Sequence, residues 1–275
     1  MGVVGHVEWV QFARVEHVPQ AGEVVHASEP FEEPAGGGAV AAVQLTRLAG
    51  SAALITALGE DEPGGRSRER LGELGVEVHA ATVESPTRRA VTLLDHQGER
   101  TILTLGRRLD PPAGLVADAL GGGISFDGIY FTAGGPEALR CAREAARVLT
   151  ASPRAVHALG HGVRIDALIL SNRDEYEVGI AEGVEHEADT VVRTEGSGGG
   201  TYQRRGADPG HWEGSDPPGP VVDGYGCGDS FAAGLTFGLA RGMELGDALA
   251  LAARCGAVCA TGHGPYERQL RGQDL

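Results

Sequence analysis

Apolar runs of strand length alternate with longer helical patterns along most of this 275-residue chain. The predicted strands lie at residues 3–10, 52–58, 129–132, 167–170 and 190–194, and the predicted helices lie at residues 36–48, 64–74, 136–149, 174–182, 229–241 and 245–260. Such alternation is typical of a largely parallel sheet that helices cover on both faces. The length suits one large α/β domain or two small ones.

Two regions depart from this alternation. Residues 23–28 alternate polar and apolar side chains, and residues 89–94 and 100–105 flank a turn-like segment at 95–98. Neither region has an adjacent crossover helix, so we expect a small β-rich lid formed by about residues 10–35 and 86–106. Residues 204–220 are rich in glycine, proline and aspartate, which indicates an irregular surface loop.

The charge of the chain excludes several kinds of partner. The formal net charge is −15, so a nucleic-acid partner is not expected, because phosphate binding needs a basic face. No run of 18 apolar residues predicts a membrane span, and the first ten residues lack the features of a signal peptide. We therefore expect a cytoplasmic protein.

All 23 basic residues are arginines, and the chain has no lysine. This excludes a Walker A phosphate loop, a protein-kinase ATP lysine and every Schiff-base mechanism. Any phosphate chemistry must then use backbone N–H groups, arginine or a metal ion.

The four cysteines are Cys141, Cys227, Cys255 and Cys259, and none of them forms a CxxC pair. This pattern favours free thiols in a reducing compartment. Cys255 and Cys259 are one helical turn apart and could share a metal ion, but no third and fourth ligands follow at a suitable spacing.

Residues 223–234 read DGYGCGDSFAAG, three glycines and an acid directly before an Ala/Leu-rich helical pattern. Glycines there let backbone N–H groups converge, and the start of a helix favours negative charge. The segment therefore predicts an anion site that needs no lysine. Asp229 can cap the helix or act as a general base beside that site, and the motif alone leaves both interpretations open.

Two further polar elements follow predicted strands. Asn172 and Glu175 are three residues apart at a helix start, an arrangement that suits Mg²⁺ and its waters but also a helix capping box. Thr194, Gly196 and Gly199 suit an ordinary hairpin turn, and their glycines would also let a nucleotide lie close to the backbone.

Together these motifs resemble the PfkB/ribokinase family of small-molecule kinases. Residues 223–234 are similar to the family's C-terminal signature D-T-x-G-A-G-D-x-F-x-x-G, and residues 172–175 and 194–199 are similar to its N-x-x-E and T-x-G-x-x-G elements. Residues 59–64 resemble the G-x-D-x-x-G after its second main strand, and Thr87 with residues 98–101 resembles its lid region. The motifs occur in the family's order along nearly the whole chain.

The resemblance implies a ribokinase-like three-layer α/β/α sandwich, in a single domain over residues 1–275, with a mostly parallel central sheet and a small β-rich lid. It also implies an ATP- and Mg²⁺-dependent transfer of the γ-phosphoryl group to an alcohol of a small sugar-like or nucleoside-like acceptor, in a homodimer that pairs through the lid. The implied catalytic residues are Asp229 as the base, with the backbone of Gly226, Cys227 and Gly228 as the anion hole. The implied nucleotide residues are Thr194, Gly196, Gly199 and Gly264, and Asn172 and Glu175 would hold the metal.

The sequence departs from the family where the acceptor should bind. Val40 stands where the N-terminal signature G-G-x-x-x-N has Asn, and Val10 stands where sugar kinases tend to carry Asp. A valine side chain makes no hydrogen bond. Gly224 and Tyr225 also replace the common threonine pair, which makes a monovalent cation beside Asp223 doubtful.

Two hypotheses follow from these departures. The acceptor is a different molecule, bound by residues such as Glu8, Gln11, Gly37, Gly38 and Arg88. Alternatively, acceptor binding has decayed, and the protein is a non-catalytic nucleotide-binding or regulatory relative.

Overall fold

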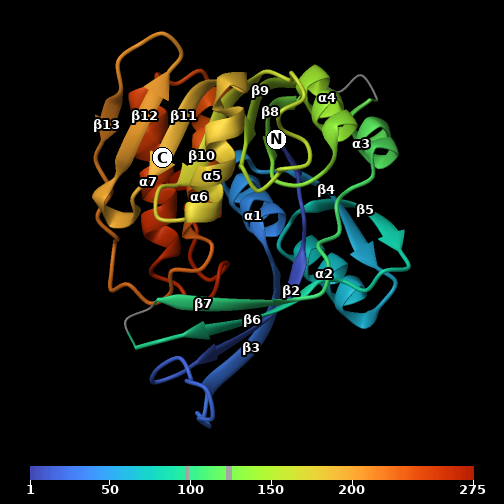
Figure 1. The fold of residues 1–275 in the computed structure, drawn as a ribbon, viewed down its shortest axis with the longest axis vertical. Coiled ribbons are helices and arrows are strands. Elements are labelled where there is room, and N and C mark those ends of the chain that lie inside the picture. The colour runs from blue at the N-terminus through green and yellow to red at the C-terminus, as the bar shows by residue number, and fades with distance from the viewer. Residues whose placement is uncertain (97–98, 122–125) are drawn as a thin grey trace.

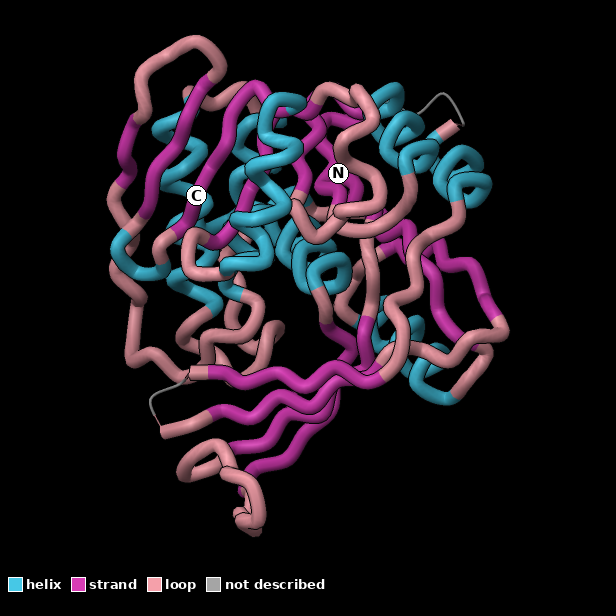
Figure 2. Tube along the Cα trace, viewed as in Figure 1, coloured by secondary structure: helices cyan, strands magenta, loops and turns pink. Residues whose placement is uncertain are grey.

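The computed structural model describes residues 1–96, 99–121 and 126–275. In this part of the chain nine strands form a main sheet, and four others form a separate small sheet that lies beside it (Figures 1 and 2). Seven α-helices pack around the main sheet.

The main sheet has the strand order β13-β12-β11-β10-β9-β8-β1-β4-β5. Its strands are β1 (Gly2–Val4), β4 (Ala53–Gly59), β5 (Glu77–Val83), β8 (Phe126–Phe131), β9 (Ala146–Ala151), β10 (Ile165–Ser171), β11 (Ala188–Thr194), β12 (Gly200–Arg204) and β13 (Gly210–Trp212). Every neighbouring pair from β5 to β11 is parallel, and β12 is antiparallel to both of its neighbours, β11 and β13. The predicted mostly parallel sheet is confirmed.

The helices form a layer on each face of this sheet. They are α1 (Gly37–Ala49), α2 (Glu62–Glu73), α3 (Ala113–Leu120), α4 (Pro136–Ala145), α5 (Glu175–Val184), α6 (Cys227–Ala240) and α7 (Leu245–Cys259). Residues of α1, α6 and α7 share one buried apolar cluster, and residues of α3, α4 and α5 share a second. Val3 of β1 belongs to the first cluster and Val4 to the second, because successive strand residues point to opposite faces. The predicted three-layer sandwich is therefore confirmed.

The small sheet has the order β3-β2-β6-β7, with strands β2 (Glu8–Arg14), β3 (Ser28–Ala35), β6 (Arg89–Leu94) and β7 (Arg100–Leu105). Strands β6 and β7 are the antiparallel pair expected from the sequence, and residues 97–98 of the predicted turn lie outside the described residues. Of residues 23–28, only Ser28 is in a strand.

The predicted single strand at residues 3–10 is wrong, because the chain forms two strands there that belong to different sheets. Strand β1 ends at Val4 and β2 begins at Glu8. Gly5 lies between them, and a Cβ on Gly5 would stand 2.7 Å from the Cα of Gly38, so the chain passes here with no room for a side chain. Both strands are buried, so their apolar residues read as one run.

The predicted helix at residues 136–149 is also too long. Helix α4 ends at Ala145, and β9 starts at Ala146 and pairs with β8 and β10. Alanine, arginine and leucine here are good helix formers, but pairing in the middle of the sheet overrides that local preference. Helix α3 and strands β5, β12 and β13 have no counterpart among the predicted elements.

Candidate active site

Asp229 lies at the start of α6, next to the loop that joins the two sheets. The N-cap of α6 is Gly226, which has φ 79°, and no side chain caps this helix. Asp229 is the third helical residue, so its interpretation as the helix cap is wrong. Its carboxylate is left facing the glycine-rich start of α1.

The surroundings of Asp229 set its protonation state. Burial raises the pKa of Asp229 to about 6, and the Arg100 guanidinium opposes this shift. The side chain is ionised at neutral pH but holds a proton more tightly than an exposed aspartate. A carboxylate with a pKa near working pH suits general-base chemistry.

Glycines at the start of α1 bring the backbone close to the carboxylate. A Cβ on Gly37 would stand 3.0 Å from Asp229 Oδ1, and a Cβ on Gly38 would stand 2.7 Å from the His6 carbonyl oxygen. A side chain at residue 38 would push α1 away from the backbone that follows β1, whereas one at residue 37 would displace the Asp229 carboxylate. Gly37 therefore lies against Asp229 and Gly38 against the backbone of His6, and their predicted role in acceptor binding stays a prediction.

A small polar network follows β1. Glu8 Oε1 lies 3.1 Å from an Arg88 guanidinium nitrogen and 3.5 Å from His6 Nε2. Thr132 Oγ1 lies 3.5 Å from His6 Nδ1. Burial, followed by the charges of Arg108 and Arg88, lowers the pKa of His6 to about 3, so the ring is neutral and its contact with Glu8 is not an ion pair.

Glu8 and Arg88 are the charged members of this network. Burial raises the pKa of Glu8, and Arg88 opposes that shift. Arg88 Nε is buried with no hydrogen-bond partner among the described residues, so this guanidinium retains a free donor. The neighbouring Arg89 is exposed, and only Arg88 turns inward.

Four other residues, on β2 and α1, take no part in this network. Gln11 is exposed on β2 and its amide donates to Glu32 at 2.8 Å. Trp9 is buried, with the Arg66 guanidinium 4.2 Å from its ring centroid, so the ring has a packing role. Val10 and Val40 are fully buried, and Val40 packs under Gly226.

Three of the four predicted nucleotide residues, Thr194, Gly196 and Gly199, lie at the turn between β11 and β12. Thr194 pairs with Gly200, which confirms the hairpin interpretation. A Cβ on Gly199 would collide with the Trp212 carbonyl oxygen, so packing alone requires glycine there. Gly196 faces the Arg173 guanidinium: a Cβ on Gly196 would stand 3.0 Å from a nitrogen of that group. A guanidinium that lies against bare glycine backbone suits a phosphate or a nucleotide edge.

The predicted metal residues lie at the end of β10. Asp174 caps α5 by accepting from the N–H groups of Tyr176 and Glu177, so the predicted capping box with Asn172 as cap is wrong. Asn172 Nδ2 donates to Glu195 at 3.1 Å, which leaves the Asn172 carbonyl oxygen available. In the described parts of the chain no three His, Cys, Asp or Glu side chains form a ready metal site. An amide oxygen and the exposed Glu175 carboxylate fit Mg²⁺ that also takes phosphate and water oxygens.

Asp223 ties the loop before α6 to the C-terminal loop. Its two carboxylate oxygens accept from the N–H of Tyr225 at 2.7 Å and the N–H of Gly264 at 2.9 Å. Gly264 in turn packs against Phe31 of the small sheet. Predicted as a nucleotide residue, Gly264 thus also joins the small sheet to the site.

Two arginines dock the small sheet on the same loop. A guanidinium nitrogen of Arg100, in β7, donates to the Gly224 carbonyl oxygen at 2.9 Å. A guanidinium nitrogen of Arg14, in β2, donates to the Val222 carbonyl oxygen at 3.1 Å. The Tyr225 ring packs edge-on against Phe12 at 4.9 Å. The small sheet is therefore held closed over the start of α6.

A second motif joins the sheets at the other end of the site. Asp61 accepts from the N–H of Thr87 at 2.8 Å, from its hydroxyl at 2.6 Å and from the N–H of Gly64 at 3.0 Å. The G-x-D-x-x-G element therefore anchors the entry to β6. Gly98, the other end of the lid resemblance, lies outside the described residues.

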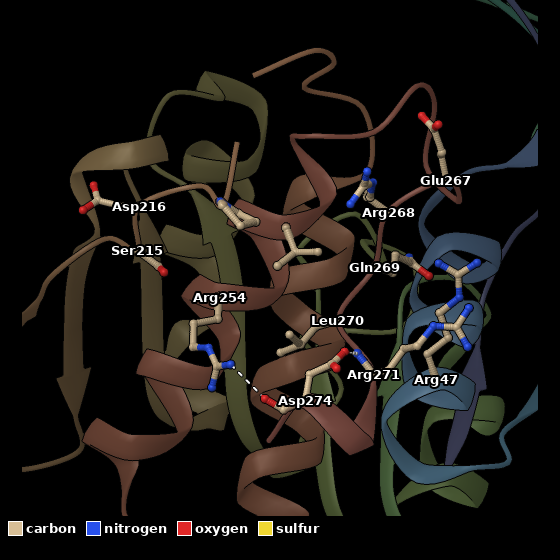
Figure 3. Close-up of a pocket in the computed structure, with 12 residues that line it drawn as sticks. Arg47, Ser215, Asp216, Arg254, Glu267, Arg268, Gln269, Leu270, Arg271 and Asp274 are labelled. Atoms are coloured by element: carbon tan, nitrogen blue, oxygen red, sulfur yellow. Dashed lines mark hydrogen bonds between the residues drawn. The ribbon is translucent and has the colours of Figure 1, made fainter. Parts of the chain in front are cut away.

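A cavity of about 440 Å³ lies between α7, the loop after β13 and the C-terminal segment (Figure 3). Four arginines line it, namely Arg47, Arg254, Arg268 and Arg271. None of the predicted site residues does, so this cavity is separate from the site around Asp229.

The sequence analysis missed His6, Thr132 and Arg100. A polar residue that follows the end of a parallel strand would have been the signal for His6 and Thr132. A single strand predicted over residues 3–10 places His6 in its middle and hides this signal. No local signal places Arg100 against Gly224.

Solved structures share this architecture over almost the whole chain. A microbiome-derived acarbose kinase is 23% identical with a TM-score of 0.81, over 99% of this chain and 96% of that one. A ribokinase from Arabidopsis thaliana, solved with ribose and ATP, is 19% identical with a TM-score of 0.72, over 99% and 96%. The fold class is thus that of the ribokinase-like proteins.

Sequence comparison identifies the family. The sequence profile of the pfkB family carbohydrate kinases matches residues 2–110 and 166–270. The chain belongs to this family. A ribokinase from Dictyostelium discoideum is 28% identical over 106 residues, which are 38% of this chain and 33% of that protein. Among the described residues, no helix has the length and apolar character needed to cross a membrane.

Proposed function

We propose that this protein transfers the γ-phosphoryl group of ATP to an alcohol group of a small sugar-like or nucleoside-like acceptor. The observation that carries the proposal is the position of Asp229. This carboxylate, with a pKa of about 6, lies on the first turn of α6 and faces the glycine-rich start of α1. Family membership and the ATP-bound ribokinase of similar fold support ATP as the donor.

In this proposal Asp229 takes the proton of the acceptor hydroxyl as that oxygen attacks phosphorus. The N–H groups of Gly226, Cys227 and Gly228 belong to the helix start, where backbone donors lack helical partners. They stabilise charge on the transferred group, the main task in phosphoryl transfer. Mg²⁺, held through Asn172 and Glu175, would neutralise phosphate charge.

The acceptor lies between Asp229 and the network after β1. Glu8 offers carboxylate oxygens and Arg88 offers its guanidinium group, and both lie at the entry to the small sheet. They replace the hydrogen bonds that Val10 and Val40 cannot make. This arrangement favours a different set of acceptor hydroxyls over a decayed site.

The test is ADP release from ATP with Mg²⁺, measured on a panel of monosaccharides, oligosaccharides and nucleosides. Wild type and Asp229→Asn are compared, and Asp216→Asn, at an exposed aspartate, is the matched control. We expect acceptor-dependent turnover that Asp229→Asn lowers by at least about a hundredfold. Equal turnover in wild type and Asp229→Asn would refute the base assignment. Nucleotide binding without turnover on any acceptor would favour the regulatory alternative.

We also propose a homodimer through the small sheet. Strand β7 is an edge of that sheet, and Ile102, Leu103 and Leu105 are exposed on it. Exposed apolar edges are usually covered. Light scattering at micromolar concentration should give twice the chain mass for wild type and the single mass for Leu103→Arg. A wild-type monomer would contradict the dimer.

A further inference from the structure

We propose that Cys227 and Cys259 form a reversible disulfide that closes the anion site in response to peroxide. Cys227 is the first residue of α6 and Cys259 is the last residue of α7, and these helices pack side by side (Figure 1). The effect on phosphoryl transfer rests on the proposed function, whereas the bond itself rests only on the thiol geometry.

The two thiols lie in contact. The Cys259 thiol can donate its hydrogen bond to Cys227 Sγ, and both sulfur atoms lie against carbonyl oxygens of the same loop. Cys227 Sγ lies 3.8 Å from the Asp223 oxygen, and Cys259 Sγ lies 3.5 Å from the Tyr225 oxygen. The helices approach closely here, because Gly256 of α7 lies against Cys227: a Cβ on Gly256 would stand 3.2 Å from the Cys227 carbonyl oxygen.

The pair has the asymmetry of an attacking and a resolving thiol. The hydrogen bond from Cys259 lowers the pKa of Cys227, and Arg100 adds to this effect against burial and the nearby Asp223 and Asp229. The same hydrogen bond and burial raise the pKa of Cys259. Cys227 is partly exposed, whereas Cys259 is fully buried. A thiolate that is accessible at a helix start reacts first.

The other two thiols lack this arrangement. Cys255 is buried against Gly234, and burial raises its pKa to about 12. Cys141 lies on α4, in the helix layer of the opposite face, and burial raises its pKa. Cys255 and Cys259, which the sequence suggested as a metal pair, are therefore not the reactive pair.

The chemistry balances with peroxide as the oxidant. The Cys227 thiolate attacks one peroxide oxygen, the O–O bond breaks, and the released hydroxide takes up the thiol proton as water. Cys259 Sγ then attacks the Cys227 sulfenic acid, the S–O bond breaks, and a second water leaves. Two thiols are oxidised and one peroxide is reduced to two waters, and dithiothreitol reverses the change.

The disulfide would act on the anion site through the backbone of α6. Sulfur atoms in a disulfide are about 2 Å apart, closer than hydrogen-bonded thiols. Closing the bond draws Cys227 toward α7, and with it the N–H groups of Gly226 and Gly228. Phosphoryl stabilisation depends on the direction of these donors.

The test treats reduced protein with hydrogen peroxide, blocks free thiols and maps peptides by mass spectrometry without reduction. Because Cys255 and Cys259 share a tryptic peptide, fragment ions must assign the linked sulfur. We expect a Cys227–Cys259 link in wild type, Cys141→Ser and Cys255→Ser. In Cys259→Ser, and in Cys259→Ala in case serine is not tolerated at this buried position, we expect no link and a Cys227 sulfenic acid that dimedone traps.

The second readout is acceptor-dependent ADP release before and after oxidation. Oxidised wild type and oxidised Cys141→Ser should lose at least about tenfold in rate, and dithiothreitol should restore it. A link through Cys255, a link between two chains, or no link would overturn the proposal, whether or not the protein is a kinase. A Cys227–Cys259 link with an unchanged rate would overturn the effect on transfer.

Discussion

Gly37 lies directly against the carboxylate of Asp229, so the start of α1 forms one wall of the space in front of the proposed base. A Cβ at residue 37 would stand 3.0 Å from Oδ1, closer than van der Waals contact allows. The carboxylate would have to rotate or withdraw. The relationship connects the N-terminal glycines with the C-terminal signature, 192 residues further along the chain.

Gly37→Ala should therefore impair the reaction more than the fold. We expect the kcat/KM for phosphoryl transfer to fall by at least about tenfold, because small displacements of a base are costly. The free energy of unfolding in urea should change by less than about 1 kcal/mol. Gly65→Ala is the control, since a Cβ there meets open space. Equal kcat/KM in both variants would contradict the contact.

The pKa of Asp229 predicts the pH dependence of transfer. Below about pH 6 the carboxylate is protonated and cannot accept the acceptor's proton. We expect kcat/KM to be level above about pH 7 and to fall about tenfold per pH unit below pH 6. ADP release in a buffer series of constant ionic strength measures this. A profile that stays level down to pH 5 would exclude Asp229 as the base.

Asp229→Asn should stabilise the fold at high pH. The folded pKa of about 6 lies above the ordinary value of 3.8, so the folded state binds the proton more tightly. Stability from this group is present at low pH and is lost as pH rises through 6. Removing the ionised carboxylate should raise the free energy of unfolding by about 1–2 kcal/mol at pH 8, and by less at pH 5.

Urea unfolding of Asp229→Asn and wild type at both pH values measures this difference. The exposed Asp216→Asn should show no pH-dependent gain. A gain for Asp229→Asn that is larger at pH 5 than at pH 8 would reverse the sign and contradict the shifted pKa.

Arg88→Met should destabilise the fold because it leaves Glu8 buried without its cation. The Glu8 side chain is 8% exposed and the Arg88 side chain 20% exposed, and a guanidinium nitrogen of Arg88 lies 3.1 Å from Glu8 Oε1. We expect a loss of about 2–3 kcal/mol in the free energy of unfolding, and the Glu8→Gln/Arg88→Met double variant should recover part of it. Arg89→Met, at the exposed neighbour, should change stability by less than about 0.5 kcal/mol. Similar losses for both arginines would contradict the pairing.

The sequence predicted the layers of the fold because burial on both faces leaves a clear pattern. The predicted strands at 52–58 and 190–194 and the predicted helices at 36–48 and 245–260 lie within about two residues of β4, β11, α1 and α7. The pattern failed at residues 3–10, where two buried strands of different sheets adjoin. It failed again at residues 146–149. These residues belong to β9, which pairs with β8 on one side and β10 on the other, and this pairing overrides their helix preference.

The candidate site divides in the same way. Local motifs were enough to single out Asp229, Asn172 and the glycines, because a helix start and a tight turn are properties of neighbouring residues. The contacts of Arg100 with Gly224 and of Glu8 with Arg88 join segments that are 124 and 80 residues apart. No local pattern encodes such contacts.

By itself, the sequence determined that any phosphate site must use backbone N–H groups, arginine or a metal ion, since the chain has no lysine. It also determined that the turn before α6 can bring those N–H groups together, because glycine permits φ 79° at residue 226. Only the tertiary structure decided that Asp229 meets Gly37, that Glu8 pairs with Arg88 and that Cys227 meets Cys259. The physical reason is that turns depend on local backbone freedom, whereas the pKa of a buried group depends on whichever distant segments pack around it.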